Sequence, residues 1–256
     1  MRFTFITRED PVYDQIKNYL FKKLSMEWEY DNTNPELLIS IGGDGTLLRG
    51  IHKYIKQLET MQVVGLHTGT LGFLTDYTKE ELDVFVHDIL KKKPKIEEAS
   101  LLEIDMPSKG IRLFALNEIR IESLEKTLSL AVYIDDEFFE LSNGSGICIS
   151  TQSGSTAVNR ALSGAVIDSG LSVLQLCEIM PIAHKNHHSL RNPYIMNDNR
   201  IITITGSSLS YAKACYDHLS IDLKDVSMIS VKTSDKKVRF ARYRPYSYLR
   251  RLKNLY

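Results

Sequence analysis

The stretch Leu37-Leu38-Ile39-Ser40-Ile41-Gly42-Gly43-Asp44-Gly45-Thr46 decides the fold, and Leu47-Leu48 follows it directly. A mostly apolar run of strand length leads straight into three glycines and one carboxylate. Apolar residues at helical spacing then begin behind the turn. We therefore predict a buried strand over residues 37–41, a tight glycine turn, and a helix.

The glycine turn carries the chemistry that this stretch suggests. Gly42, Gly43 and Gly45 permit positive φ angles and a close approach of a ligand to the main chain. Backbone N–H groups at such a turn and at the helix start can point at phosphate oxygens. Asp44 is electrostatically unfavourable beside a bound phosphate, but it has a purpose there if it takes a proton from an attacking hydroxyl.

A second interpretation of the same turn is purely structural. Asp44 could cap the following helix, and the glycines could form no more than a strand-to-helix connection. The motif is neither a Walker A loop nor G-x-G-x-x-G, because no Lys follows the last glycine and the glycine spacing differs.

Strands alternate with helices over the first 98 residues. Strand patterns over 3–6, 37–41 and 63–66 alternate with helical patterns over 12–23, 47–55 and 82–90. This alternation predicts a parallel sheet with helices on its faces. A second glycine loop, from His67 to Phe73, follows the third strand. Ligands of such sheets bind at the carboxyl ends of the strands, where both glycine loops lie.

The pattern changes after Pro94. Residues 99–235 read as short strands separated by turns, with short helices expected from Ser155 and over 173–177. A basic segment over 236–256 ends in a short helical pattern. The predicted fold class is therefore α/β plus mainly β: an N-terminal parallel-sheet α/β domain with a C-terminal β-sandwich-like domain.

Composition excludes several classes of function. The chain has 256 residues and a formal net charge of zero, so bulk charge predicts neither nucleic-acid nor membrane binding. The N-terminus lacks an apolar signal region and no apolar run could span a bilayer, so the cytoplasm is expected.

Cys148, Cys177 and Cys215 are scattered, which argues against disulfides and zinc. The basic tail is either a solvated face or an attraction for a polyanionic nucleotide.

Further polar segments follow the glycine loops. Asn117 at a strand end suits the edge of a base, and the adjacent Glu118 could accept from a ribose hydroxyl. The segment from Ser150 to Ala157 could bind a ligand or form an N-cap, and no nucleophile elbow surrounds Ser155.

Asp217-His218 is predicted to form a hairpin tip. Three histidines, at positions 184, 187 and 188, lack the carboxylate or Cys that a metal site would need, so no metal site is expected there.

Taken together, these segments resemble the NAD kinase family. The resemblance rests on Ile-Gly-Gly-Asp-Gly-Thr-Leu-Leu, Gly-Thr-Leu-Gly-Phe, Leu-Asn-Glu, Ser-Thr-Gln-Ser-Gly-Ser-Thr-Ala and the Asp-His hairpin, in that order over nearly the whole chain. Gly-Gly-Asp-Gly alone is shared with diacylglycerol kinases and phosphofructokinase relatives, and the later motifs make the resemblance specific.

The resemblance implies phosphorylation of the 2′-hydroxyl of the adenosine ribose of NAD, with ATP or polyphosphate as donor and Mg²⁺ arriving on the phosphates. It implies that the basic tail packs back on the first domain, that Asp44 activates the hydroxyl, and that the chain forms a homodimer or homotetramer. The residues that would bind substrate are Phe73, Asn117, Glu118, Ser145, Ser153, Thr156, Ala157, Val158, Ala161 and His218.

Three positions depart from the family pattern. Ser145 stands where an Asp is usual, Val158 where a Tyr is usual, and Ala161 where a Ser is usual. In the family these positions serve the nicotinamide half of the dinucleotide. A second hypothesis is therefore a catalytically weak, dinucleotide- or adenosine-binding regulatory homologue with an altered nicotinamide subsite.

Overall fold

A computed structural model describes residues 1–8, 11–69, 72–182 and 189–253. The chain divides into two compact units: Met1–Ala99 together with Lys236–Tyr256, and Ser100–Asp235. The basic C-terminal segment thus belongs to the same unit as the N-terminal residues. Thr70 and Leu71 of the second glycine loop, and the histidines at 184, 187 and 188, lie outside the described residues.

The first unit is an α/β domain around a parallel sheet. Its strands run in the order β17-β4-β3-β1-β2, all parallel, and β5 extends from β4. The elements are β1 (Arg2–Thr7), α1 (Pro11–Leu24), β2 (Glu29–Tyr30), β3 (Leu37–Ile41), α2 (Asp44–Lys53), β4 (Gln62–His67), β5 (Tyr77–Thr78), the 3₁₀ turn η1 (Lys79–Glu81), α3 (Leu82–Lys91), part of β17 (Met228–Arg242) and α5 (Tyr248–Lys253).

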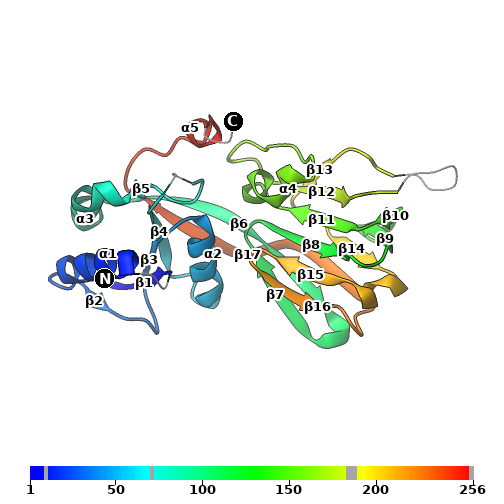
Figure 1. Cartoon of the computed structure of the whole chain (residues 1–256), viewed down its shortest axis with the longest axis horizontal. Coiled ribbons are helices and arrows are strands. Elements are labelled where there is room, and N and C mark those ends of the chain that lie inside the picture. Colours follow the sequence, from blue (N-terminus) through cyan, green and yellow to red (C-terminus); the bar gives the residue numbers. More distant parts are fainter. Residues whose placement is uncertain (9–10, 70–71, 183–188, 254–256) are drawn as a thin grey trace. The chain divides into compact units, whose positions relative to one another are not determined.

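Helices cover both faces of this sheet (Figure 1). The alternate residues Leu37, Ile39 and Ile41 of β3 join the core that contains the apolar faces of α1 and α3. On the opposite face, the backbone of α2 at Gly50 lies against the side chains of Leu38 and Ile6. Burial on both faces explains why β3 is apolar nearly throughout rather than alternating.

The second unit is built from two antiparallel sheets. One contains β10-β9-β14-β17 with β6 and β7, and the other has the order β13-β12-β11-β8-β15-β16. The elements are β6 (Lys95–Met106), η2 (Pro107–Lys109), β7 (Ile111–Ala115), β8 (Glu118–Glu122), β9 (Leu128–Ile134), β10 (Glu137–Gly144), β11 (Gly146–Ser150), η3 (Ser153–Thr156), α4 (Val158–Ala161), β12 (Val173–Ile179), β13 (Tyr194–Asn197), β14 (Ile202–Thr205), η4 (Ser207–Tyr211), β15 (Lys213–Tyr216) and β16 (Leu219–Asp222).

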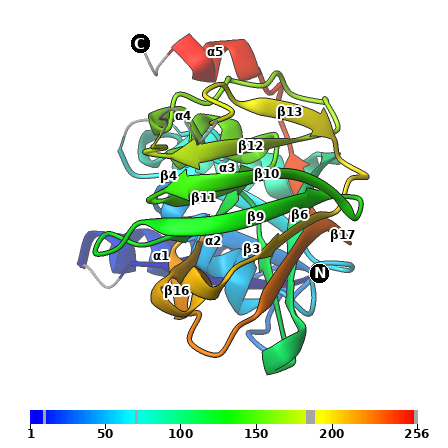
Figure 2. The same cartoon turned by 90° about the vertical axis from the view of Figure 1, so that its right-hand side faces the viewer.

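The core of the second unit lies between its sheets. Inward-facing residues of β6, β9, β14 and β17 meet those of β8, β11, β12 and β15 in one apolar cluster. Figure 2 shows β9 and β10 of one sheet beside β11 and β12 of the other. This arrangement matches the predicted β-sandwich-like domain. No helix among the described residues is long and apolar enough to cross a membrane.

Three local predictions differ from the structure, one in the type of element and two in its bounds. The helix predicted over 173–177 is strand β12, because the segment pairs with β11 and β13, and this pairing overrides the helical spacing of its apolar residues. The helix predicted from Ser155 is instead the 3₁₀ turn η3 followed by the short α4. The two strands predicted over 228–232 and 238–241 form the single strand β17, which pairs with β6 and continues through its polar middle.

Candidate active site

The first glycine turn joins β3 to α2. Gly42 has φ +146°, a conformation that favours glycine, and its N–H donates to the carbonyl oxygen of Leu66 at 2.9 Å. That bond ties the turn to the end of the neighbouring strand β4. Gly43 is the N-cap residue of α2, and the helix begins at Asp44.

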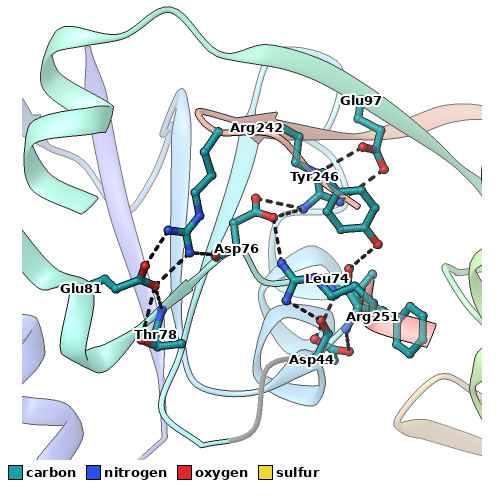
Figure 3. Close-up of polar contacts among 12 residues, drawn as sticks. Asp44, Leu74, Asp76, Thr78, Glu81, Glu97, Arg242, Tyr246 and Arg251 are labelled. Carbon is teal, nitrogen blue, oxygen red and sulfur yellow. Dashed lines mark hydrogen bonds and ion pairs between the residues drawn. The ribbon is translucent and has the colours of Figure 1, made fainter. Parts of the chain in front are cut away.

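The carboxylate of Asp44 does not cap its own helix. It accepts the N–H of Phe73 at Oδ2 over 2.8 Å and the N–H of Leu74 at Oδ1 over 3.1 Å (Figure 3). Gly72 lies so close that a Cβ there would overlap this carboxylate. Asp44 therefore joins the two glycine loops that follow β3 and β4, and the capping interpretation is wrong.

The start of α2 presents backbone donors beside that carboxylate. The N–H of Thr46 already donates to the carbonyl oxygen of Gly43 at 2.9 Å, whereas the N–H groups of Asp44 and Gly45 precede the first intrahelical hydrogen bond of α2. Together with the helix dipole they favour an anion at this point. Each carboxylate oxygen of Asp44 has a second lone pair besides the one used by the loop amide, so the group can still accept a proton.

His67 at the end of β4 is a site residue that the sequence analysis did not single out. Its Nδ1 accepts the N–H of Gly69 at 2.8 Å, which places the proton of the neutral ring on Nε2. Nε2 lies 3.3 Å from where a Cβ of Gly43 would stand. Burial lowers the pKa of His67, and the charge of Asp44 opposes the shift. The signal in the sequence was its place at a strand end, next to the second glycine loop.

In the second unit, Asn117 lies in the connection between β7 and β8. The N–H groups of Leu116 and Asn117 donate to the two carboxylate oxygens of Asp217, each at 2.8 Å. Asp217 is at the tip of the β15–β16 hairpin with φ 49°, and His218 follows it. The predicted hairpin therefore exists, and Asp217 brings His218 and Asn117 together.

The Ser/Thr-rich segment packs on the same connection. The hydroxyl of Thr151 donates to the carbonyl oxygen of Leu116 at 2.6 Å, and a Cβ on Gly154 would overlap the carbonyl oxygen of Asn117. Ser153, Thr156 and Ala157 follow, each half-buried. The hydroxyl of the buried Ser155 accepts the N–H of Ile167 at 3.1 Å, so this side chain has a structural partner.

Glu118 is the first residue of β8 and is buried. Burial raises its pKa to about 7, the charges of Asp217 and Glu122 add to the shift, and Arg120 opposes it. One of its carboxyl oxygens, Oε2, is buried without a hydrogen-bond partner among the described residues. A ligand hydroxyl is a suitable partner for such an oxygen.

The three departing positions lie at two places in the second unit: one in the connection between β10 and β11, and two on α4. Ser145 connects β10 to β11, and its hydroxyl donates to the sulfur of Met180 at 3.8 Å. Val158 begins α4 and Ala161 ends it. Ala161 and Met180 both line a cavity of about 310 Å³. The structure thus brings Ser145 and Ala161 to a common neighbour, Met180, which the sequence analysis did not identify.

Three arginines of the basic tail form ion pairs with carboxylates of their own unit. Arg242 donates to both carboxylate oxygens of Asp76 at 3.0 Å, and Arg244 pairs with Glu81 at 2.7 Å. Arg251 lies 3.6 Å from Asp76. The hypothesis that the tail attracts a nucleotide therefore does not hold for these three arginines. Their main partners are carboxylates of the same unit.

The comparisons with known proteins agree with this architecture. Residues 16–93 match the ATP-NAD kinase N-terminal domain, and residues 116–243 match the ATP-NAD kinase C-terminal domain. Solved structures with the same fold include a yeast NADH kinase complexed with NADH (TM-score 0.84, 19% identity, 100% of this chain and 87% of that one) and an NAD kinase from Archaeoglobus fulgidus in complex with ATP (TM-score 0.77, 23% identity, 100% and 97%).

Curated relatives match over nearly the full length. NAD kinase 1 of Halalkalibacterium halodurans is 36% identical over 261 residues, covering 99% of this chain and 97% of that protein. The NAD kinase of Shouchella clausii is 34% identical over 264 residues, covering 100% and 99%. With both domains matched in order and relatives of this similarity along its whole length, the chain belongs to the NAD kinase family of phosphotransferase enzymes.

Proposed function

We propose that this enzyme transfers the terminal phosphoryl group of ATP to the 2′-hydroxyl of the adenosine ribose of NAD, giving NADP and ADP. The observation that carries the proposal is Asp44, a carboxylate fixed beside the unpaired amides of a helix start. The kinase with NADH and the kinase with ATP, both of the same fold, support a dinucleotide and ATP as ligands.

The proposed step begins with the hydroxyl proton. Asp44 takes this proton while the ribose oxygen forms a bond to the terminal phosphorus. The bond from that phosphorus to its bridging oxygen breaks, and the electron pair leaves with ADP. The amides of the first turn of α2 and the Nε2–H of His67 face the charge on the phosphoryl oxygens.

The adenosine half of the substrate is assigned to the second unit. The side chain of Asn117 would pair with the adenine edge, Ser153 and Thr156 would line it, and Glu118 would accept from the ribose. His218 is held near Asn117 through Asp217. Phe73, whose N–H binds Asp44, belongs to the first unit and is also proposed as a substrate-binding residue.

The described residues do not form a protein cage for Mg²⁺, since they contain no group of three or more acidic, His or Cys side chains that could hold a metal ion. We propose that the ion enters on the phosphates of ATP, where Mg²⁺ keeps waters and needs few protein ligands. Polyphosphate is a second candidate donor. A cytoplasmic homodimer or homotetramer remains part of the proposal.

A second candidate function is a catalytically weak dinucleotide-binding protein. Ser145, Val158 and Ala161 favour it, because they remove polar and aromatic groups at positions assigned to the nicotinamide half. Asp44 favours the enzyme, because the proposed base is present.

The test is coupled detection of NADP with purified protein. NAD and NADH would be compared as acceptors, and ATP and polyphosphate as donors, each with Mg²⁺. We expect NADP to form from NAD and ATP. Tight binding of NAD by calorimetry without any phosphorylated product, with either donor, would favour the regulatory candidate.

A further inference from the structure

The turn that holds Asp44 is itself held from the other side by the C-terminal segment. Arg251 Nη1 donates to the carbonyl oxygen of Gly72 at 3.1 Å, and the hydroxyl of Tyr246 donates to the carbonyl oxygen of Phe73 at 3.0 Å (Figure 3). All of these residues belong to the first unit, although nearly 180 positions separate the partners in sequence.

These bonds form a matched set. The carbonyl of Gly72 and the N–H of Phe73 belong to one peptide group, and the carbonyl of Phe73 and the N–H of Leu74 belong to the next. Each of the two peptide groups therefore accepts a hydrogen bond from the tail at one end and donates one to Asp44 at the other. Because a peptide group is planar, anchoring both ends fixes its orientation.

The arrangement also strengthens the donors that face Asp44. Hydrogen bonds in a chain polarise one another, so a peptide whose carbonyl accepts from a guanidinium is a better N–H donor. Arg251 supplies that charge from a buried position. Burial lowers the pKa of Arg251, and the negative charges of Asp76 and Asp44 are among those that oppose the shift. An arginine remains charged in this setting.

The tail donors are fixed in turn by their own neighbours. The guanidinium of Arg242 lies 4.2 Å from the ring centre of Tyr246 and binds Asp76 with two hydrogen bonds. Arg251 shares Asp76 at 3.6 Å, and the ring of Tyr248 lies 5.7 Å from that of Phe73. Both tail donors are therefore held by side chains of the first unit besides the 72–74 turn.

We propose that Arg251 and Tyr246 are positioning residues for phosphoryl transfer, which set the orientation of the Asp44 carboxylate through the two peptide groups of the 72–74 turn. The inference rests on the proposed role of Asp44 as base. The orientation of Asp44 affects the rate of the chemical step, so loss of these contacts should lower kcat. The KM for NAD should stay nearly unchanged, because we assign NAD binding mainly to the second unit.

The test compares single-group variants under saturating ATP. Tyr246→Phe removes one hydroxyl and keeps the ring beside Arg242, while Arg251→Met removes the charge at similar length. We expect each to lower kcat roughly ten- to a hundredfold, the scale of a small misplacement of a catalytic group, with KM for NAD within about twofold. Arg251→Lys, which keeps a cation, should recover part of the loss.

Two controls separate positioning from general stability. Arg250→Met alters an exposed neighbour on α5 and should leave kcat unchanged. Arg244→Met removes the pair with Glu81, which anchors the tail without touching the 72–74 turn. Melting temperatures would be measured for all variants. If Arg251→Met fails to fold, Tyr246→Phe carries the test alone. A loss of kcat in Arg244→Met as large as in Tyr246→Phe would overturn the inference.

A double-mutant cycle distinguishes this inference from the proposed function. In an Asp44→Asn background, measured by sensitive NADP detection, adding Tyr246→Phe should have almost no further effect, because the group it positions is gone. If Asp44→Asn lowers kcat but Tyr246→Phe lowers it equally in both backgrounds, the positioning inference is wrong, while the assignment of Asp44 as the base still holds. If Asp44→Asn leaves kcat near normal, the base assignment itself is wrong.

Discussion

The carboxylate of Asp44 combines two tasks that can be separated at the scale of a single residue. It holds the 72–74 turn through two amides, and in the proposed reaction it also takes a proton. A neutral amide in its place keeps the size of the side chain. Its single carbonyl oxygen can satisfy only one of the two loop amides, and it cannot accept a proton at neutral pH.

We expect Asp44→Asn to lower kcat by about 10²–10⁴-fold, the usual contribution of a general base. Affinity for NAD, measured by calorimetry, should change little, because the residues that we propose for adenosine binding lie in the second unit. Asp14→Asn, at an exposed position on α1, is the matched control. Near-normal turnover in Asp44→Asn would contradict the role of Asp44 as general base and would mean that its carboxylate only holds the 72–74 turn.

Asn117 offers a second test on one side chain. Its backbone N–H binds Asp217 and its carbonyl oxygen accepts the N–H of Thr151, so Asn117→Ala keeps both anchors of the connection. The side-chain amide alone is removed. We expect all adenosine ligands to weaken by roughly 1–3 kcal/mol, the cost of leaving a base edge unpaired. Calorimetry with AMP and NAD should show equal losses, and a loss confined to NAD would place Asn117 elsewhere.

At the scale of elements, sequence patterns predicted the elements that are determined by neighbouring residues. They missed the strand pairings and loop contacts between segments that are distant in sequence. The strand–turn–helix of β3 and α2 followed from apolar spacing and glycine, and the Asp217-His218 hairpin from its turn residues. Strand β12 was predicted as a helix because its partners β11 and β13 are distant in sequence. The bonds from Asp44 to Phe73 and Leu74, and from Asp217 to Leu116 and Asn117, cross between loops, where periodicity carries no information.

The departing positions lead to a prediction about the elements that carry them. Ser145 cannot give the charge-assisted acceptor that Asp would, a bond of roughly 1.5–3 kcal/mol. Val158 lacks an aromatic face, which is worth roughly 1–3 kcal/mol by analogy with stacked bases. The contributions are not additive, because the groups would touch one ligand. Even so, about 2 kcal/mol is more than tenfold in affinity.

We therefore expect NAD to bind not much better than a compact adenosine ligand. The triple variant Ser145→Asp, Val158→Tyr, Ala161→Ser should gain selectively for NAD, as calorimetry of NAD against AMP would show. Met180, which contacts Ser145 and lines the cavity beside Ala161, is the neighbour that must accommodate the larger side chains. If the variant gains nothing, or the unmodified protein already prefers NAD strongly, other residues recognise nicotinamide.

At the scale of the whole molecule, each unit has a large apolar core of its own, and the strands β6 and β17 each contribute residues to both units. The units divide between Ala99 and Ser100, a few residues after the change of sequence pattern at Pro94. The continuity of β17 was not predictable, because its middle, Thr233 to Lys237, is polar and reads as a turn when considered without its partner strand β6.

The buried Glu118 and the half-buried Glu140 of the second unit make the stability of the molecule depend on pH. Burial raises the pKa of Glu118 to about 7, with Asp217 adding to the shift. Burial likewise raises the pKa of Glu140 to about 7, with Glu178 adding. The ordinary value for Glu is 4.5. Between these values the unfolded chain has lost the proton that the folded chain still holds, so stability falls as pH rises.

For Glu118 the shift corresponds to a free energy of unfolding on the order of 3 kcal/mol. That stability is fully present below pH 4.5 and is lost as pH rises through about 7. The neutral amide of Glu118→Gln does not titrate. The difference in unfolding free energy between the unmodified protein and this variant, from urea titrations between pH 4 and 8, should therefore fall across that window and level off above it. A constant difference for Glu118→Gln would mean that this carboxyl titrates alike in the folded and unfolded chain, and that its buried oxygen is solvated by a partner such as bound water.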